Sequence, residues 1–371
     1  MIPNAHHRMR LVAAALPLLL VSSLAWAGHK VQRVEKKTVE VNGETIIVIS
    51  NARGKTIVIG EPGAKNVTIV ASMLVHAKDS DTAGRVMESL HFDVEKKDDT
   101  IAVISKLPRS DKGGHSFWSV VKGDKYGALI DFTIEVPRNF DVETSTTSGD
   151  VHVSGINGTA RVIATSGDVL LREIGGASTI ELTSGAIEVS GIGGSLRIAA
   201  SSGDARIERV KGILQVQTTS GNVSAMEVGG DAMVHLITGD VDLQGCLGNV
   251  NISTASGNAR IVGVLGGVNA TSASGDLDVF IIPVGDKEFY MNTATGDVSV
   301  HFLPDLDYGF LLDVNTCTGA IRGDMELTKL DQVSRRKLKG TVGNGKSRVI
   351  IETASGNVSI VERTEKHKKH D

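Results

Sequence analysis

Aliphatic and polar residues alternate along the chain from residue 148 onward. An aliphatic side chain stands three and five residues after each Ser or Thr of a recurring Ser-Gly or Thr-Gly dipeptide, and the residues between are mostly polar. This alternation predicts short β-strands with one buried face. The inward residues that it predicts are Val151 and Val153, Val169 and Leu171, Ile187 and Val189, Ala205 and Ile207, Val223 and Ala225, Val241 and Leu243, Ala259 and Ile261, and Leu277 and Val279.

A second alternating run follows another glycine in each segment. Each segment therefore supplies two short strands separated by glycine-bearing corners. The clearest inward pairs of the second run are Ala160 and Val162, Leu196 and Ile198, Leu214 and Val216, and Val250 and Ile252.

The dipeptides recur every 18 residues, and the period loosens after residue 275, where Thr295-Gly296, Thr318-Gly319 and Ser355-Gly356 follow at wider spacing. A fixed period predicts a repeat architecture. Glycine suits corners that need a positive φ, so we interpret the regular set as structural turns. That set is Gly149, Gly167, Gly185, Gly203, Gly221, Gly239, Gly257 and Gly275.

Strands this short cannot bury a face alone, so the repeats must stack about 4.8 Å apart. The predicted fold is all-β: a single-chain β-solenoid (β-helix) over residues 141–361, with rungs of about 18 residues and two short strands per rung. The left-handed hexapeptide helix of acyltransferases has the same coil length. Its third inward position would fall on Asp150 or Asp168, so we set it aside and leave the handedness open.

Residues 28–140 lack the strict period and are predicted to form an irregular β-rich N-terminal segment that caps the solenoid. β-rich runs occupy 45–50, 56–59, 67–70, 101–104 and 130–136. One short helix is predicted over 80–90, capped by Ser80 or Asp81. Its buried face would carry Ala83, Val86, Met87 and Leu90.

The two termini carry no predicted fold. Arg8 and Arg10 precede an uncharged stretch that ends in Ala25-Trp26-Ala27, so residues 1–27 are predicted to be a signal peptide. We therefore expect an exported protein, periplasmic or at the cell surface, with no transmembrane span after signal removal. Residues 362–371 are expected to be a charged, disordered tail.

Composition narrows the function classes. The chain has 371 residues, of which 41% are hydrophobic and only 4% aromatic, so a core of stacked aliphatics is expected. The formal charge of −4 gives no reason to expect nucleic acid as a partner.

The repeat also predicts the state of the two cysteines. Cys246 takes an inward position, and Cys317 is expected four rungs later, about 19 Å away at about 4.8 Å per rung. A disulfide needs Cα atoms within about 7 Å, so none is expected.

Several motifs together resemble a known family. A strand with Ile134, Val136 and Pro137 leads into recurring Thr-Ser-Gly-Asp-Val turns. The chain closes on Gly-Thr-Val-Gly-Asn-Gly at 340–345 and Ile-Glu-Thr-Ala-Ser-Gly-Asn-Val at 351–358. Over residues 36–361 this resembles the bacterial DUF4097 family of exported, adhesin-like β-solenoids. The resemblance implies the solenoid and, by analogy, adhesion at the cell envelope, and it transfers no catalytic residue.

Aspartates at the Ser-Gly-Asp corners are the most prominent polar feature. They would stack along one edge, where their oxygens suit either Ca²⁺ or hydrogen bonds to turn backbone. Asn and Ala interrupt the column, so we favour turn-making and expect no bound metal or cofactor. The column comprises Asp150, Asp168, Asp204, Asp240, Asp276 and Asp297.

Two insertions are the candidate binding sites, because function tends to lie on loops over a rigid scaffold. The first, 106–126, carries Trp118 among lysines and glycines. The second, 329–348, is a basic loop in an acidic protein and would meet anionic polymers. The candidate binding residues are Trp118, Arg335, Arg336, Lys337 and Lys339.

The leading hypothesis is an exported, non-enzymatic, adhesin-like solenoid that binds envelope polysaccharide, lipid headgroups or another envelope protein. The alternatives are an assembly scaffold without a small ligand, and a polysaccharide-active β-helix enzyme with Asp305 and Asp307 as its acid pair. His152, His235 and His301 have no spacing that would bring them together, and we expect them to be solvated.

Overall fold

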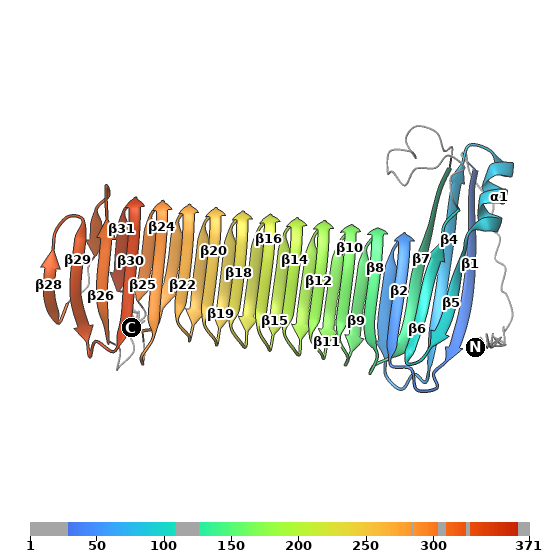
Figure 1. The fold of residues 1–371 in the computed structure, drawn as a ribbon, viewed down its shortest axis with the longest axis horizontal. Coiled ribbons are helices and arrows are strands. Elements are labelled where there is room, and N and C mark those ends of the chain that lie inside the picture. Colours follow the sequence, from blue (N-terminus) through green and yellow to red (C-terminus); the bar gives the residue numbers. More distant parts are fainter. Residues whose placement is uncertain (1–28, 109–125, 284, 303–308, 324–326, 363–371) are drawn as a thin grey trace, which may run out of the picture.

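Two long β-sheets run side by side along the whole molecule. The computed structural model describes residues 29–108, 126–283, 285–302, 309–323 and 327–362. Sheet A has fifteen strands and sheet B has sixteen, and each regular rung contributes one strand to each sheet (Figure 1). The predicted β-solenoid is confirmed. The predicted signal peptide and nearly all of the predicted tail lie outside the described residues.

The regular rungs contribute strands of five to eight residues. In sheet A they are β9 (Val151–Ile156), β11 (Val169–Ile174), β13 (Ile187–Ile192), β15 (Ala205–Val210), β17 (Val223–Val228), β19 (Val241–Cys246), β21 (Ala259–Val264), β23 (Leu277–Ile281) and β25 (Val298–Phe302). In sheet B they are β8 (Asp141–Ser148), β10 (Ala160–Ser166), β12 (Ser178–Ser184), β14 (Leu196–Ser202), β16 (Leu214–Ser220), β18 (Ala232–Thr238), β20 (Val250–Ser256), β22 (Val268–Ser274) and β24 (Glu288–Thr295).

The two ends contain the remaining elements. The N-terminal end has β1 (His29–Glu40), β2 (Ile46–Arg53), β3 (Thr56–Glu61), β4 (Asn66–Ala77), α1 (Ser80–Ser89), β5 (His91–Lys97), β6 (Thr100–Lys106) and β7 (Tyr126–Pro137). The C-terminal end has β26 (Gly309–Thr316), β27 (Ile321–Gly323), β28 (Lys329–Val333), β29 (Lys337–Gly343), β30 (Ser347–Ser355) and β31 (Val358–Glu362). No helix of the described residues is long and apolar enough to cross a membrane.

The core is the continuous aliphatic column predicted from the alternation. Every inward residue named above is at most 6% exposed. Between β8 and β22 neighbouring rungs pair in parallel without a register shift, so that Val169 lies between Val151 and Ile187. Because each rung places like residues on like, burial repeats along the axis and each rung depends on its two neighbours.

The Ser-Gly corners are packed more tightly than a turn alone requires. Gly203 has a φ of +126°, where a side chain is strained. A Cβ at this position would also overlap the carbonyl oxygen of Gly185 in the preceding rung. Both the backbone conformation and the rung spacing therefore require glycine.

We predict that Gly203→Ala lowers the free energy of unfolding by about 2 kcal/mol or more, because positive-φ strain and overlap act together. Urea unfolding of the purified protein measures the change. Gly84→Ala is the matched control: Gly84 lies in α1 with open space around its Cα, and alanine there should stabilise by about 0.5–1 kcal/mol. Equal effects of the two variants would contradict the stacking argument.

The N-terminal segment continues both sheets. Strands β2 and β3 pair with β8 and β9, and β6 and β7 lie on the outer side of β2 and β3. Helix α1 packs against β1 and β4 and buries its predicted face, including Leu90 just beyond its end. Its N-cap is Asp79, one residue before the predicted cap, because the extended Asp79 reaches the backbone N–H of Thr82 at 2.7 Å.

The last rung is inserted out of chain order. Strand β30 lies between β24 and β26 in sheet B, and β31 lies between β25 and β27 in sheet A. The expectation that Cys317 lies four rungs after Cys246 is therefore wrong. Five strand positions separate β19 from β27, or about 24 Å. Both cysteines are free, as predicted.

Deleting residues 346–371 should release the C-terminal end, because it removes both β30 and β31. Amide hydrogen exchange should show β26 and β29 losing protection while β9–β22 keep theirs, since rungs depend mainly on nearest neighbours. Deleting only 363–371 is the control and should leave all strands protected. If β26 stays protected after the longer deletion, the inserted rung is not what holds this end.

Candidate functional site

The corner aspartates form a hydrogen-bond ladder along the solenoid. In successive rungs the side-chain oxygen of the Asp or Asn after the corner glycine accepts from the backbone N–H one rung further on. Asp240, for example, accepts from Asn258 at 2.7 Å. The other steps are Asp150 to Asp168, Asp168 to Ala186, Asp204 to Asn222, Asn222 to Asp240, Asn258 to Asp276, Asp276 to Asp297 and Asp297 to Asn357, all at 2.7–3.0 Å. The predicted turn-making role is confirmed.

A metal ion needs several ligands converging on one point. The described residues contain no group of three or more His, Cys, Asp and Glu placed to hold one. The corner oxygens are instead spread along the axis, each against a backbone amide. Ala186 interrupts this ladder because it offers no side-chain oxygen to Asp204 in the next rung.

Ala186→Asn should fill that gap and raise the free energy of unfolding by about 0.5–1.5 kcal/mol, the net worth of one hydrogen bond. Asn222→Ala removes an equivalent acceptor from Asp240 and should lower it by a similar amount. Denaturant titration of both variants tests the ladder. Two unchanged unfolding curves would mean that these hydrogen bonds contribute nothing.

The first candidate binding residue, Trp118, lies outside the described residues, as do Asp305 and Asp307. The histidines lie apart on β9, β18 and β25. Burial lowers the pKa of His152. The expectation of a solvated His301 is wrong: its ring stacks on Phe280 with centroids 4.2 Å apart, and Nε2 lies 3.0 Å from Asp278.

The predicted basic loop is a β-hairpin. Strands β28 and β29 pair antiparallel at the outer edge of sheet B, which corrects the expectation of a loop. The Ser334 hydroxyl closes the turn by accepting from the N–H groups of Arg336 and Lys337 at 3.3 and 3.0 Å. Two carbonyls of the turn, those of Arg335 and Arg336, accept from the N–H groups of Ile321 and Thr316 and attach the turn to the rung formed by β26 and β27. We call residues 329–343 the basic hairpin.

The basic hairpin carries an unbalanced positive charge. Lys339 pairs with Asp313 at 3.3 Å and Lys329 with Asp331 at 3.0 Å. Within the part of the chain that the structure describes, no ion pair involves Arg335, Arg336 or Lys337. The structure thus brings the four predicted basic residues together in one hairpin, and three of them make no ion pair within the described residues.

Apolar side chains accompany these charges. Sheet B extends two strands beyond β27, the last described strand of sheet A. Leu330 therefore aligns through Gly340 with the buried Leu312, yet it is 53% exposed, and Val333 is 66% exposed. The tip is amphipathic, because the face of sheet B that points to the core extends beyond sheet A, so that its apolar side chains are left uncovered.

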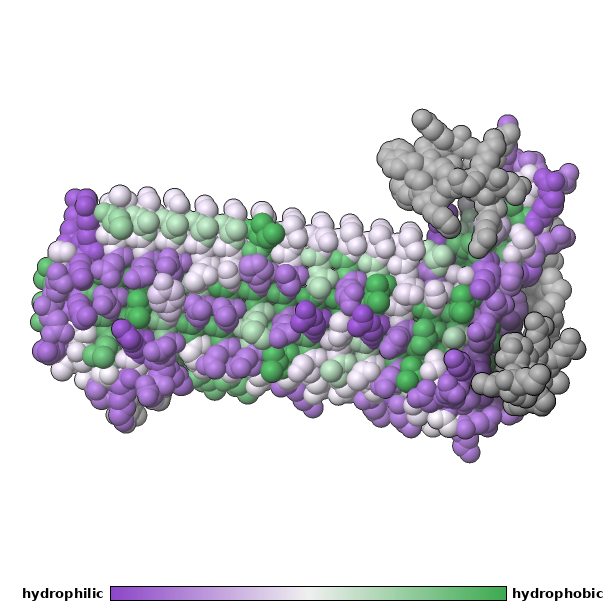
Figure 2. All heavy atoms as spheres, viewed as in Figure 1, coloured by the Kyte–Doolittle hydropathy of each residue, from purple (hydrophilic) through white to green (hydrophobic). Residues whose placement is uncertain are grey.

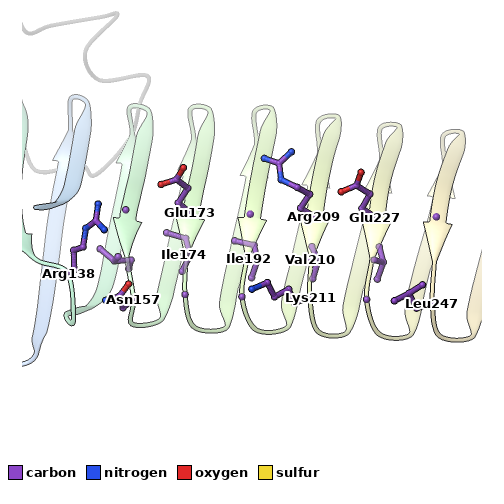
Figure 3. A pocket seen from close by; sticks show the side chains of 18 residues that line it. Arg138, Asn157, Glu173, Ile174, Ile192, Arg209, Val210, Lys211, Glu227 and Leu247 are labelled. Atoms are coloured by element: carbon purple, nitrogen blue, oxygen red, sulfur yellow. The ribbon is translucent and has the colours of Figure 1, made fainter. Parts of the chain in front are cut away.

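A second surface, which the sequence reasoning missed, is a groove along the lower edge of the solenoid. It has a volume of about 720 Å³ and crosses six consecutive rungs (Figure 3). One wall, the bulge column, consists of Gly155, Glu173, Gly191, Arg209, Glu227 and Gly245. The other wall, the corner column, consists of Asn157, Gly175, Gly193, Lys211, Gly229 and Leu247. We call this surface the lateral groove.

The bulge column is strained at its charged positions. Its residues are skipped in the pairing of neighbouring strands and have positive φ, from +71° to +76° at the glycines and +53° to +59° at Glu173, Arg209 and Glu227. A left-handed non-glycine residue costs about 1 kcal/mol or more. The signal was present in the sequence as positions 18 residues apart that hold either glycine or a charged residue.

Two other polar features of the sequence have structural partners. Asp242 and Asp278 flank Arg260, at 4.0 and 3.6 Å. Cys246 is fully buried and its thiol donates to the Gly230 carbonyl at 3.2 Å, and burial raises its pKa. Figure 2 shows hydrophilic residues along the visible side of the rod as well as at its two ends.

These features define a β-solenoid with an amphipathic basic tip and a lateral groove. The family described as Toastrack DUF4097 matches residues 131–233 and 214–361. The two matches together span more than half of the chain, so this chain belongs to the DUF4097 family. No curated protein matches it.

The solved structures that match this chain are distant from it in sequence. A "putative cell adhesion protein" from Clostridium sporogenes is 12% identical and covers 90% of this chain and 100% of its own, with a TM-score of 0.22. A "putative adhesin" from Bacteroides fragilis is 12% identical, covering 88% and 97%, with a TM-score of 0.24. A "putative lipid binding protein" from Parabacteroides distasonis is 11% identical, covering 89% and 97%, with a TM-score of 0.25. TM-scores this low show no close structural similarity.

Proposed function

We propose that the protein is an exported, non-enzymatic, adhesin-like β-solenoid that presents a binding surface at the bacterial cell envelope, in the periplasm or at the cell surface. The observation that carries the proposal is the position of the basic hairpin. It lies at the opposite end of a rigid rod from β1 (Figure 1). Fifteen strands at about 4.8 Å give a rod of about 70 Å.

The chemistry of the tip favours an anionic partner. Arg335, Arg336 and Lys337 are free of ion pairs within the described residues, and Leu330 and Val333 stand exposed beside them. Cations next to apolar side chains suit the surface of anionic lipid headgroups and the repeating acids of envelope polysaccharides. Another envelope protein with an acidic face would use the same cations.

The assembly alternative would pair the exposed edges at the two ends of the rod. The edge strands are β28 and β5 in sheet B, and β27 and β1 in sheet A. Strands β1, β5 and β28 all carry charged side chains, which are a common guard against pairing on edge strands. This observation favours a ligand-binding tip over a head-to-tail polymer.

The triple variant Arg335→Gln, Arg336→Gln, Lys337→Gln should lose affinity for anionic polymer and anionic vesicles. At about 1 kcal/mol per basic residue the loss is about 3 kcal/mol, roughly 100-fold. Binding of the mature protein, residues 28–371, is measured by co-sedimentation with phosphatidylglycerol vesicles and by interferometry on immobilised polygalacturonate. Binding of the unchanged protein should weaken as salt is raised.

A charge-matched control separates the tip from net charge. Arg161→Gln, Arg172→Gln, Arg206→Gln removes three cations from the sides of the rod, where each lies in an ion pair. This variant should retain nearly full affinity. If both triple variants lose affinity equally, binding depends on overall charge and the tip hypothesis is wrong.

Trp118 is a second proposed contact with the ligand, and its fluorescence can report on binding. Trp118 is the only tryptophan of residues 28–371. A fluorescence shift on titration with polymer, abolished by a Trp118→Phe change that also weakens binding, would place the N-terminal insertion in the binding surface. A shift-free titration with intact affinity leaves the basic hairpin as the binding site.

A further inference from the structure

The lateral groove carries charges that the fold does not use. The carboxylates of Glu173 and Glu227 and the ammonium of Lys211 make no hydrogen bond or ion pair within the described residues. Arg209 donates to Ser190 at 2.8 Å and lies 3.7 Å from Glu208, and it makes no ion pair with Glu227 in the next rung. The charges of the groove therefore do not neutralise one another.

The backbone indicates that these charges have a purpose other than stability. Of the four described non-glycine residues with positive φ, three are Glu173, Arg209 and Glu227, and all three line this groove. Glycine occupies the same column at Gly191 and Gly245, where only ordinary contacts would meet a Cβ. Packing in this column thus accommodates either glycine or a side chain, and it does not require the strained charged residues. Strained charged residues at a concave surface point to ligand binding.

The shape of the groove selects an extended ligand. Its floor is the backbone of the corner together with buried aliphatics such as Ile174, Ile192 and Val210. Six rungs at about 4.8 Å give a length of about 24 Å between the first and the last. At about 3.3 Å per residue this accommodates about seven residues of extended peptide.

Other ligand classes fit less well. The lining includes no aromatic residue on which a sugar ring could stack. Charges of both signs on the walls oppose a bare acyl chain, whose burial needs apolar surroundings. The third of the six rungs presents Gly191 and Gly193 on both walls, so backbone rather than side chains faces a ligand at this point.

We propose that the lateral groove binds an extended peptide segment with a basic residue at position i, an acidic residue at i+3 and a basic residue at i+4. Glu173 and Glu227 stand on the same wall three rungs apart, about 14 Å, which matches four residues of extended chain. Lys211 stands on the opposite wall two rungs from Glu173, about 10 Å, which matches three residues.

The alternation of an extended chain agrees with this arrangement. Side chains at i and i+4 point to one side of a strand, and the side chain at i+3 points to the other. The two basic residues then face Glu173 and Glu227 while the acidic residue faces Lys211. Figure 3 shows Glu173, Arg209 and Glu227 on one side of the floor and Lys211 and Leu247 on the other. The partner is a peptide segment of mixed charge, and this proposal does not depend on the basic hairpin.

The test compares three labelled peptides by fluorescence anisotropy with the protein of residues 28–371. The probe is Thr-Lys-Val-Ser-Glu-Lys-Thr, and the charge-reversed control is Thr-Glu-Val-Ser-Lys-Glu-Thr. A spacing control, Thr-Lys-Glu-Val-Ser-Lys-Thr, keeps the composition and moves the acid. The probe should bind about tenfold or more tightly than either control, a difference of about 1.4 kcal/mol. Equal binding of the three peptides, or none, would overturn the proposal.

Two variants test whether the peptide binds at the lateral groove. Glu173→Gly, Glu227→Gly should lose the preference for the probe and unfold at a higher denaturant concentration, because glycine relieves the positive-φ strain. If the double variant is destabilised, the two glutamates serve the fold and the proposal fails. Glu173→Lys, Lys211→Glu, Glu227→Lys should reverse the preference in favour of the charge-reversed peptide. Retention of the original preference would place any peptide binding elsewhere.

The basic hairpin supplies the remaining control. The triple variant at Arg335, Arg336 and Lys337 should bind the probe as the unchanged protein does, because the hairpin lies at the end of the rod and the groove on its side. Loss of probe binding in this variant would assign the peptide to the hairpin and overturn the groove assignment. A failure of polyanion binding leaves the groove result unaffected.

Discussion

The close approach of one corner glycine to the next is the constraint on which the rest of the structure depends. At Gly203 a side chain would overlap the backbone of the preceding rung, and the same is true of the corner glycines on either side. A rung can therefore stack only if its glycine returns to the same place, which holds the coil at 18 residues over the regular rungs. Hydrogen bonds and aliphatic burial supply the favourable free energy, and the glycine column sets the register in which they form.

Once the register is set, equivalent positions of successive repeats form a column of residues along the rod. The positions after the corner glycine become the Asp and Asn ladder, in which each side chain satisfies an amide of the next rung. The positions six residues beyond that glycine become the bulge column, where Glu173, Arg209 and Glu227 accept backbone strain. Residues that are 18 apart in sequence thus become neighbours. A change at the same position in several successive repeats therefore creates a continuous surface along the rod.

The ends of the solenoid are built differently, because a terminal rung has one neighbouring rung instead of two and exposes unpaired strand edges. Both ends depart from chain order: β2 and β3 lie inside β6 and β7, and β30 and β31 lie inside β26 and β27. In each case a later or earlier segment covers an edge that would otherwise pair with another molecule. The outermost strands, β1 and β28, are then guarded by charge. At the C-terminal tip this guard also concentrates the cations that we propose as the ligand contact.

By itself the sequence determined the strands, the inward residues, the corner glycines and the turn-making aspartates, because all of these repeat locally with a period of 2 or 18. The helix face of Ala83, Val86 and Met87 was equally readable. Only the tertiary structure decided where the last rung inserts, since β30 pairs with β24 across some fifty residues that follow no period. It alone turned the basic segment into a hairpin at the rod's tip. It also made a groove of the bulge column, because concavity depends on how neighbouring rungs place their side chains in space.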